Sequence, residues 1–97
     1  MTPSVSADAG RELIDGAVYY AEHANAELAF AFIAEFERAL KVLCQAPRLG
    51  AVWRHATRRF PLRRFPYSII YQVKADELRV LAIAHQRRRP GYWTGRK

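Results

Sequence analysis

The sequence is poor in the residues that mark several common protein classes. Its 97 residues contain a single cysteine, Cys44, which cannot pair within the chain, so we expect a reducing, cytoplasmic environment. The longest helix-length stretch without a polar or charged side chain is residues 28–34, far short of the roughly 20 residues that cross a bilayer. The first residues lack the basic start and apolar run of a signal peptide. We therefore expect a cytoplasmic protein with no membrane segment.

Residue sets for metal, nucleophilic or phosphate-loop chemistry are also missing. His23, His55 and His85 lie about 30 residues apart, with no cysteine or carboxylate at ligand spacing, so no metal site is expected. The five glycines are scattered singly and form no glycine-rich phosphate loop. Cys44 falls near the buried end of an expected helix, where an inert thiol is the usual state. The sequence predicts no metal and no cofactor.

Charge is distributed unevenly along the chain. The net charge is +7, and thirteen of the sixteen basic residues are arginine. Residues 1–46 hold three basic and seven acidic residues, whereas residues 47–97 hold thirteen basic and two acidic ones. The second half therefore has a positive field that attracts phosphate-rich polymers or an acidic protein partner, and its arginines favour planar, bidentate contacts. A solvated basic surface without a partner is the alternative.

Helical periodicity dominates the first half of the chain. Apolar residues at helical spacing predict one helix over residues 9–23, capped by Ser6 or Asp8, and a second helix that Asn25 caps and that ends before Pro47. Only one or two residues join them, so the two helices must fold back as an antiparallel hairpin.

The second half alternates apolar and polar residues with the period of a strand. Strands are expected over residues 57–62, 65–73 and 78–84, with a hairpin turn at residues 74–77, while residues 5–6 are at most a stub of strand. Such a meander has one apolar face, which the helices cover. The sequence predicts an α+β fold in which an antiparallel helix hairpin packs on a three- to four-stranded antiparallel β-sheet.

Arginines are interleaved with aromatic residues in the basic half. The segments are Arg58-Arg59-Phe60, Arg63-Arg64-Phe65, and Arg87-Arg88-Arg89 followed by Tyr92, Trp93 and Arg96. On a strand, each arginine pair places one member on the solvent face. Arginine beside an exposed aromatic binds RNA backbones and unpaired bases, and it also forms hot spots of protein interfaces. Spacing does not separate these two uses, and the closing aromatic pair could instead pack back over the sheet.

Several segments, in order along the chain, resemble one protein family. They are residues 12–20, the stripe Phe32…Phe36…Leu40, Pro47…Gly50, residues 58–71, residues 80–85 and the ending Arg87-Arg88-Arg89-Pro90-Gly91-Tyr92-Trp93…Arg96. Together they resemble the ParE/RelE superfamily of toxins from bacterial type II toxin–antitoxin systems. The resemblance implies a single toxin domain over residues 1–97, a helix hairpin against an antiparallel sheet, and a cognate protein antitoxin.

The superfamily uses two mechanisms, and the resemblance favours one of them. ParE-like members inhibit DNA gyrase without catalysis, and the ending of this chain is closer to theirs. This implies target contacts through Arg87, Arg88, Arg89, Tyr92, Trp93 and Arg96. A third possibility is a non-toxic subunit that binds the antitoxin and an operator as a co-repressor.

RelE-like members instead cut mRNA on the ribosome, with basic residues and a tyrosine that stabilise charge and transfer protons. The positions that match this alternative are Arg59, Arg63, His85, Arg88 and Tyr92. One position departs from the pattern, because Ser68 stands where such nucleases carry an arginine three residues before the final tyrosine of the strand. The missing arginine weakens the nuclease alternative, so no catalytic residue is assigned.

The antitoxin is expected to be acidic and partly disordered, and to fold onto the toxin as a hetero-oligomer. Its carboxylates would pair with arginines, for which Arg58, Arg63 and Arg64 are the candidates. Phe30 lies off the buried stripe of the second helix, so it either anchors the antitoxin or is simply an exposed aromatic.

Overall fold

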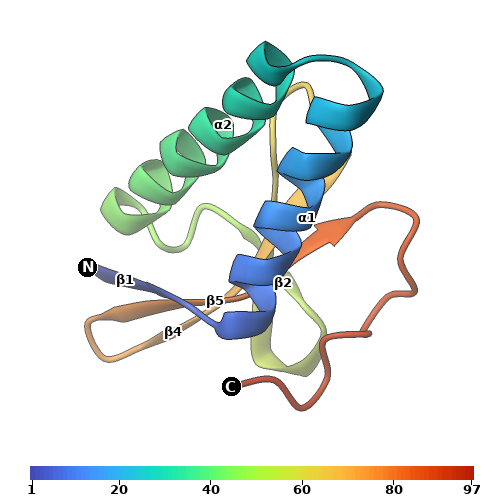
Figure 1. Ribbon diagram of the computed structural model, residues 1–97. Coiled ribbons are helices and arrows are strands. Elements are labelled where there is room, and N and C mark those ends of the chain that lie inside the picture. The colour runs from blue at the N-terminus through green and yellow to red at the C-terminus, as the bar shows by residue number, and fades with distance from the viewer.

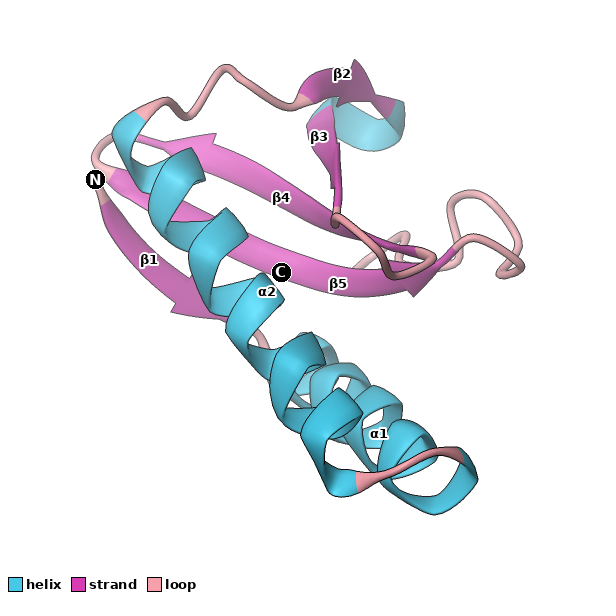
Figure 2. Ribbon diagram, turned by 90° about the horizontal axis from the view of Figure 1, so that it is seen from above, coloured by secondary structure: helices cyan, strands magenta, loops and turns pink.

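A computed structural model describes all 97 residues as two helices and five strands. In chain order the elements are β1 (Thr2–Val5), α1 (Ala7–His23), α2 (Ala26–Gln45), β2 (Ala51–Trp53), a short 3-10 turn (Arg54–Ala56), β3 (Thr57–Pro61), β4 (Tyr67–Lys74) and β5 (Glu77–His85). Figure 1 shows the helices as a hairpin, and in Figure 2 the loop that joins them lies well clear of the sheet. Neither helix is long and apolar enough to cross a bilayer.

Side-chain caps determine where both helices begin. The Ser6 hydroxyl accepts a hydrogen bond from the Ala9 amide at 3.1 Å, so α1 starts at Ala7, two residues before the expected position. The Asn25 side chain caps α2 as expected, accepting from the Leu28 amide at 2.8 Å. The antiparallel helix hairpin predicted from the short linker is confirmed.

The sheet is mixed, with five strands in the order β1-β5-β4-β3-β2. The three expected strands are present as the antiparallel set β3, β4 and β5. β1 pairs in parallel with the first half of β5, from Thr2 opposite Glu77 to Val5 opposite Val80. The prediction of a purely antiparallel sheet with three to four strands was therefore wrong in this detail. β1 has only four residues and no alternation of apolar and polar side chains, so its sequence does not predict a strand. Its partner, β5, lies about 75 residues further along the chain.

The second unexpected strand, β2, forms a hairpin with β3. His55 and Ala56 connect the two strands with left-handed φ values of 57° and 59°. Neither residue type is a usual marker of such a turn, so the sequence did not reveal it. Pro61 ends β3 and pairs only with Ser68 on β4, because the pairing with β2 stops at Arg59. A register irregularity lies between Ile70 and Tyr71 on β4.

Apolar clusters lie on both faces of the sheet, because successive residues of a strand such as Ile69 and Ile70 project to opposite sides. The larger cluster joins the helices to the sheet and includes the buried side chains Phe32, Phe36, Leu43, Ile69, Tyr71, Val80 and Ile83. The smaller cluster consists of Ile70, Leu81, Ala82 and Trp93. Trp93 follows β5 in the chain, so the C-terminal residues cover a face that the helices leave open.

Candidate functional site

Residues 86–97, called the tail below, contain no helix or strand, yet Tyr92, Trp93 and Arg96 hold them against the fold. Trp93 is 3% exposed and packs in the cluster with Ile70, Leu81 and Ala82. In Figure 1 the red tail leaves β5 and finishes near the start of α1. Of the two arrangements considered for the closing aromatic pair, the chain adopts the packed one. The expectation of Trp93 as an exposed target contact is therefore corrected, because its indole covers apolar sheet surface.

Glu12 on α1 ties the tail to the edge of the sheet. Its carboxylate accepts hydrogen bonds from the Ile83 amide at 3.0 Å, from the Tyr92 hydroxyl at 2.7 Å and from Arg96 Nη1 at 2.9 Å. The Ile83 amide needs such an acceptor because β1 pairs with β5 only as far as Val80. The Glu12 side chain thus accepts hydrogen bonds from an unpaired backbone amide at the edge of β5 and from two side chains of the tail.

This arrangement changes the roles expected for Tyr92 and Arg96. Burial raises the pKa of the Tyr92 phenol, and the hydrogen bond to Glu12 raises it further. Burial would lower the pKa of Arg96, but the hydrogen bond and charge of Glu12, together with Tyr92 and Asp8, outweigh burial, and the pKa is raised. Both side chains therefore keep their protons and are bound within the molecule. Sequence reasoning missed Glu12, since nothing near it in the chain signals partners about 70 to 80 positions away.

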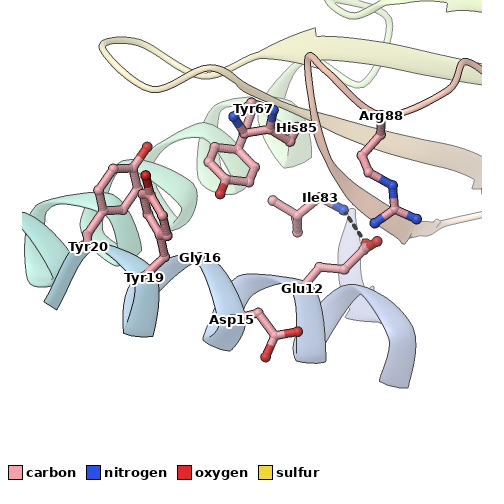
Figure 3. Close-up of a pocket in the computed structure, with 9 residues that line it drawn as sticks. All are labelled: Glu12, Asp15, Gly16, Tyr19, Tyr20, Tyr67, Ile83, His85 and Arg88. Atoms are coloured by element: carbon pink, nitrogen blue, oxygen red, sulfur yellow. Dashed lines mark hydrogen bonds between the residues drawn. The ribbon is translucent and has the colours of Figure 1, made fainter. Parts of the chain in front are cut away.

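A cavity of about 360 Å³ lies between α1 and the ends of β4 and β5. Figure 3 shows Tyr19 and Tyr20 at one end and Arg88 at the other, with Tyr67 and His85 along the strand side. The Tyr67 and His85 rings meet edge to face, with centroids 4.9 Å apart. The lining therefore combines aromatic rings with the carboxylates of Glu12 and Asp15 on α1 and a guanidinium at one end.

The two titratable side chains on the strand side of this cavity, His85 and Tyr67, are both neutral. Burial lowers the pKa of His85, and the nearby Arg87 charge lowers it further. His85 Nδ1 accepts a hydrogen bond from the Arg87 amide at 3.1 Å, which requires an unprotonated nitrogen. Burial raises the pKa of Tyr67, with a contribution from Tyr20. At neutral pH neither ring carries a charge.

A second, smaller cavity of about 200 Å³, called the basic pocket below, lies between the tail and the face of the sheet that the tail covers. Its charged lining is entirely positive, and its other distinctive members are aromatic: Arg59, Arg88, Arg89, Trp53, Tyr92 and Trp93. Arg59 of β3 reaches it because Arg59 is registered with Ile70 on β4, so both lie on the face that the tail covers.

The basic pocket brings together four of the five residues that match the nuclease alternative. Arg59, His85, Arg88 and Tyr92 all line it, whereas Arg63 is exposed in the loop between β3 and β4 and does not. Ser68, which replaces an arginine of the nuclease pattern, is also in the lining.

The candidate antitoxin contacts lie in different environments. Phe30 is 74% exposed on α2, as its position off the buried stripe predicts. Arg58 is engaged within the fold, because its Nη1 donates to the Gly50 carbonyl at 2.8 Å. Arg63 and Arg64 are exposed, and neither forms an ion pair.

Two further apolar side chains are exposed on α1. Ile14 is 62% exposed and Val18 is nearly half exposed, and their spacing of four residues puts them on one side of the helix. Together with Phe30 they leave the helix hairpin with apolar surface that the fold itself does not cover.

Comparison with known proteins identifies the type of fold and the family. A family model described as "ParE toxin of type II toxin-antitoxin system, parDE" matches residues 4–90. A solved structure titled "Chromosomal ParDE TA system from P. aeruginosa" is similar to this chain, with a TM-score of 0.78 and 24% sequence identity. The match covers 88% of this chain and 95% of that one. No curated protein matches.

Proposed function

This chain belongs to the ParE toxin family of type II toxin–antitoxin systems, and we propose that it acts in the cytoplasm as an inhibitor of DNA gyrase that a cognate acidic antitoxin neutralises. It is a ParE-like toxin, and the similar ParDE structure supports an antitoxin as its protein partner. Gyrase as the target rests on the ParE-like ending of the sequence and on the tail described above.

The observation that carries this proposal is the exposed arginine run of the anchored tail. Arg87, Arg88 and Arg89 are all exposed, and none has a carboxylate within ion-pair distance. The end of β5 at His85 holds the run on one side, and buried Trp93 with the Tyr92–Glu12 hydrogen bond holds it on the other. The three guanidinium groups are therefore presented with little loss of chain entropy on binding. A preorganised cationic segment of this kind suits contact with an acidic protein surface.

Purified protein in gyrase supercoiling and cleavage-complex assays tests the proposal. We expect inhibition at micromolar concentration that is lost when Arg87, Arg88 and Arg89 are all replaced by glutamine. Replacing Lys41, Arg48 and Lys74 by glutamine removes the same charge at exposed positions elsewhere and should leave inhibition intact. Unchanged supercoiling and unchanged cleavage-complex levels with the wild-type chain would show that gyrase is not the target.

Ribosome-dependent mRNA cleavage is the second candidate, because the basic pocket gathers Arg59, His85, Arg88 and Tyr92. Against it, the pKa of Tyr92 is raised and its hydroxyl donates to Glu12, so the phenol stays protonated at neutral pH and is not available as a general base. Codon-phased mRNA cuts during expression would favour the nuclease. A Tyr92→Phe variant that is fully toxic with intact mRNA would oppose it. Harmless expression without antitoxin would favour a co-repressor subunit instead.

For the antitoxin, the proposed contacts are Phe30 together with the exposed Arg63 and Arg64. The exposed side chains of Ile14 and Val18 add apolar surface for a segment that folds on binding. Arg58 contributes less directly, since its guanidinium already holds the loop after α2. Because the ionic part is screened by salt, affinity should fall between about 50 and 500 mM salt. A salt-independent affinity would contradict the electrostatic part of this proposal.

A further inference from the structure

The basic pocket holds positive charge that nothing in the chain neutralises. Arg59, Arg88 and Arg89 line it, and no aspartate or glutamate does. None of the three forms an ion pair, whereas the chain pairs Arg11, Arg38 and Arg96 with carboxylates elsewhere. Three unpaired guanidinium groups around one small cavity create a site for an anion from outside the chain.

A buried donor in the same pocket wall also lacks an acceptor. Trp93 lines the pocket, and its Nε1 is buried without a hydrogen-bond partner. Among buried side-chain nitrogen and oxygen atoms of the chain it is alone in this respect. Buried N–H groups of folded proteins are nearly always paired, so an orphaned one needs an explanation. Arg89 is exposed, and its side chain forms no ion pair and covers no ring, so it is free to shift and admit an acceptor beside the indole.

The surrounding groups select among possible anions. The aromatic faces that would stack on nucleic-acid bases are covered by guanidinium groups: Arg59 lies 5.2 Å from the Trp53 ring, and Arg88 lies 4.0 Å from the Tyr92 ring. Base stacking, a main source of affinity for single-stranded nucleic acids, is therefore blocked. The remaining lining includes the apolar side chain of Ile70.

An acidic side chain fits these features better than a phosphodiester. A glutamate has methylene groups that can contact Ile70 and the indole, and a planar carboxylate that matches a guanidinium in two parallel hydrogen bonds. Its second oxygen can accept from an N–H donor such as that of Trp93. A tetrahedral phosphodiester has no apolar stem and would leave that part of the lining uncovered.

We propose that the basic pocket binds the carboxylate of a glutamate side chain from an acidic protein partner, with Arg59 as its principal ligand and Trp93 Nε1 as a second donor. The identity of the partner rests on the proposed function: it is the antitoxin. The occupied pocket would cover Arg88 and Arg89, so the antitoxin would mask part of the arginine run assigned to gyrase.

The test is an NMR titration of the full-length, ¹⁵N-labelled chain, because each tryptophan indole gives its own N–H signal. The probe is the peptide acetyl-Ala-Glu-Ala-amide, its matched control is acetyl-Ala-Gln-Ala-amide, and a short oligothymidylate represents phosphate. We expect the glutamate peptide to move the Trp93 indole signal downfield and to saturate, while the glutamine peptide leaves it in place. No saturable shift at high millimolar peptide, or tighter binding of the oligothymidylate at this signal, would overturn the proposal.

Two variants locate the binding in the pocket. Arg59→Gln should lower the affinity for the glutamate peptide by about tenfold or more, the usual effect of losing a charge-assisted hydrogen bond. Trp93→Phe keeps a ring in the cluster and removes the N–H, so it should lower the affinity for the glutamate peptide about fivefold. In this variant, which lacks the indole signal, binding is measured by the shift of the Ala84 amide signal. Arg48→Gln, an equal charge change outside the pocket, should have no effect. Equal loss in Arg48→Gln and Arg59→Gln would mean general charge attraction and would overturn the site.

The complex with the cognate antitoxin separates this inference from the proposed function. If the complex forms and the Trp93 indole signal stays at its free position, the pocket proposal is wrong and the antitoxin pairing stands. If no antitoxin binds but the glutamate peptide still shifts the signal, the pocket stands and the choice of partner is wrong.

Discussion

The Tyr92 hydroxyl donates a hydrogen bond to the Glu12 carboxylate at 2.7 Å across 80 positions of sequence. The same carboxylate accepts from Arg96 and from the Ile83 amide. An acidic residue of the helical half therefore holds the basic tail in place. The opposite charges of the two halves of the sequence therefore help to hold the halves together, in addition to attracting partners.

Replacing Glu12 by glutamine should loosen the tail. The substitution removes the charge that Arg96 pairs with, in a side chain only 16% exposed, so we expect a loss of about 2 kcal/mol in the free energy of unfolding. Hydrogen exchange at the Ile83 amide should become faster, because its acceptor is weakened. Urea unfolding and amide exchange measure both effects. Asp15→Asn, an exposed site one turn along α1, is the control, and equal losses in both variants would contradict the anchoring role.

Two glycines of α1 should respond in opposite ways to alanine. A Cβ at Gly16 would lie 2.7 Å from Phe32 Cε2, and Phe32 is fully buried, so Gly16→Ala should destabilise the protein by about 1–3 kcal/mol. A Cβ at Gly10 meets nothing within 4 Å, so Gly10→Ala should stabilise by about 0.5–1 kcal/mol through helix propensity. Thermal unfolding distinguishes them. Stabilisation by both substitutions would show that the contact between α1 and Phe32 is loose.

Acid should destabilise the attachment of the loop between β3 and β4. Glu35 accepts from Arg38 Nε at 2.7 Å and from the Arg63 amide at 2.7 Å, and mainly the Arg38 hydrogen bond lowers its pKa below the ordinary 4.5. The unfolded chain therefore binds the proton first as the pH falls. The stability from Glu35 is complete above about pH 4.5 and is lost as the pH falls through the folded pKa.

Glu35→Gln should flatten this part of the pH dependence and cost about 2 kcal/mol at neutral pH, as measured by urea unfolding across the acid range. Glu37→Gln, at an exposed position on the same helix, provides the comparison. An acid dependence that is the same in Glu35→Gln as in the wild-type chain would rule out Glu35 as its source.

Phe30→Ser should affect binding and leave folding unchanged. Since Phe30 is 74% exposed, its loss should change the free energy of unfolding by less than about 0.5 kcal/mol. If Phe30 anchors the antitoxin, affinity should fall about tenfold, as for a buried interface aromatic. Calorimetry with the purified antitoxin measures this. Leu49→Ser, at another exposed apolar site, should bind normally, and wild-type affinity in Phe30→Ser would mean that Phe30 is only an exposed aromatic.

Much of the fold could be read from local patterns. The caps at Ser6 and Asn25, the helical stripe containing Phe32 and the alternation along β4 all depend on neighbours in sequence, and all are present. β1 and β2 escaped prediction because each is only three or four residues long. Their strand state comes from pairing with β5 and β3 and not from their own composition.

The candidate site was less predictable than the fold. The sequence singled out the arginine run and the aromatic pair, but it left open whether Trp93 is exposed or packs over the sheet, and the structure buries it. It also treated Tyr92 and Arg96 as free contacts, although Glu12 engages both. The resemblance to the toxin family rests on the order in which short segments of given residue types follow along the chain. That order does not show which side chains contact each other in the folded protein.

Composition and periodicity alone determined that this chain has an acidic helical half and a basic half built on strands, because helix stripes, strand alternation and net charge are local properties. Only the tertiary structure decided which arginines are bonded to groups of the chain itself and which remain without a counter-charge. Arg96 is paired and Arg58 holds a loop, whereas Arg59, Arg88 and Arg89 surround a cavity without a counter-charge. Pairing depends on distances between residues far apart in sequence, which the fold sets and local patterns do not contain.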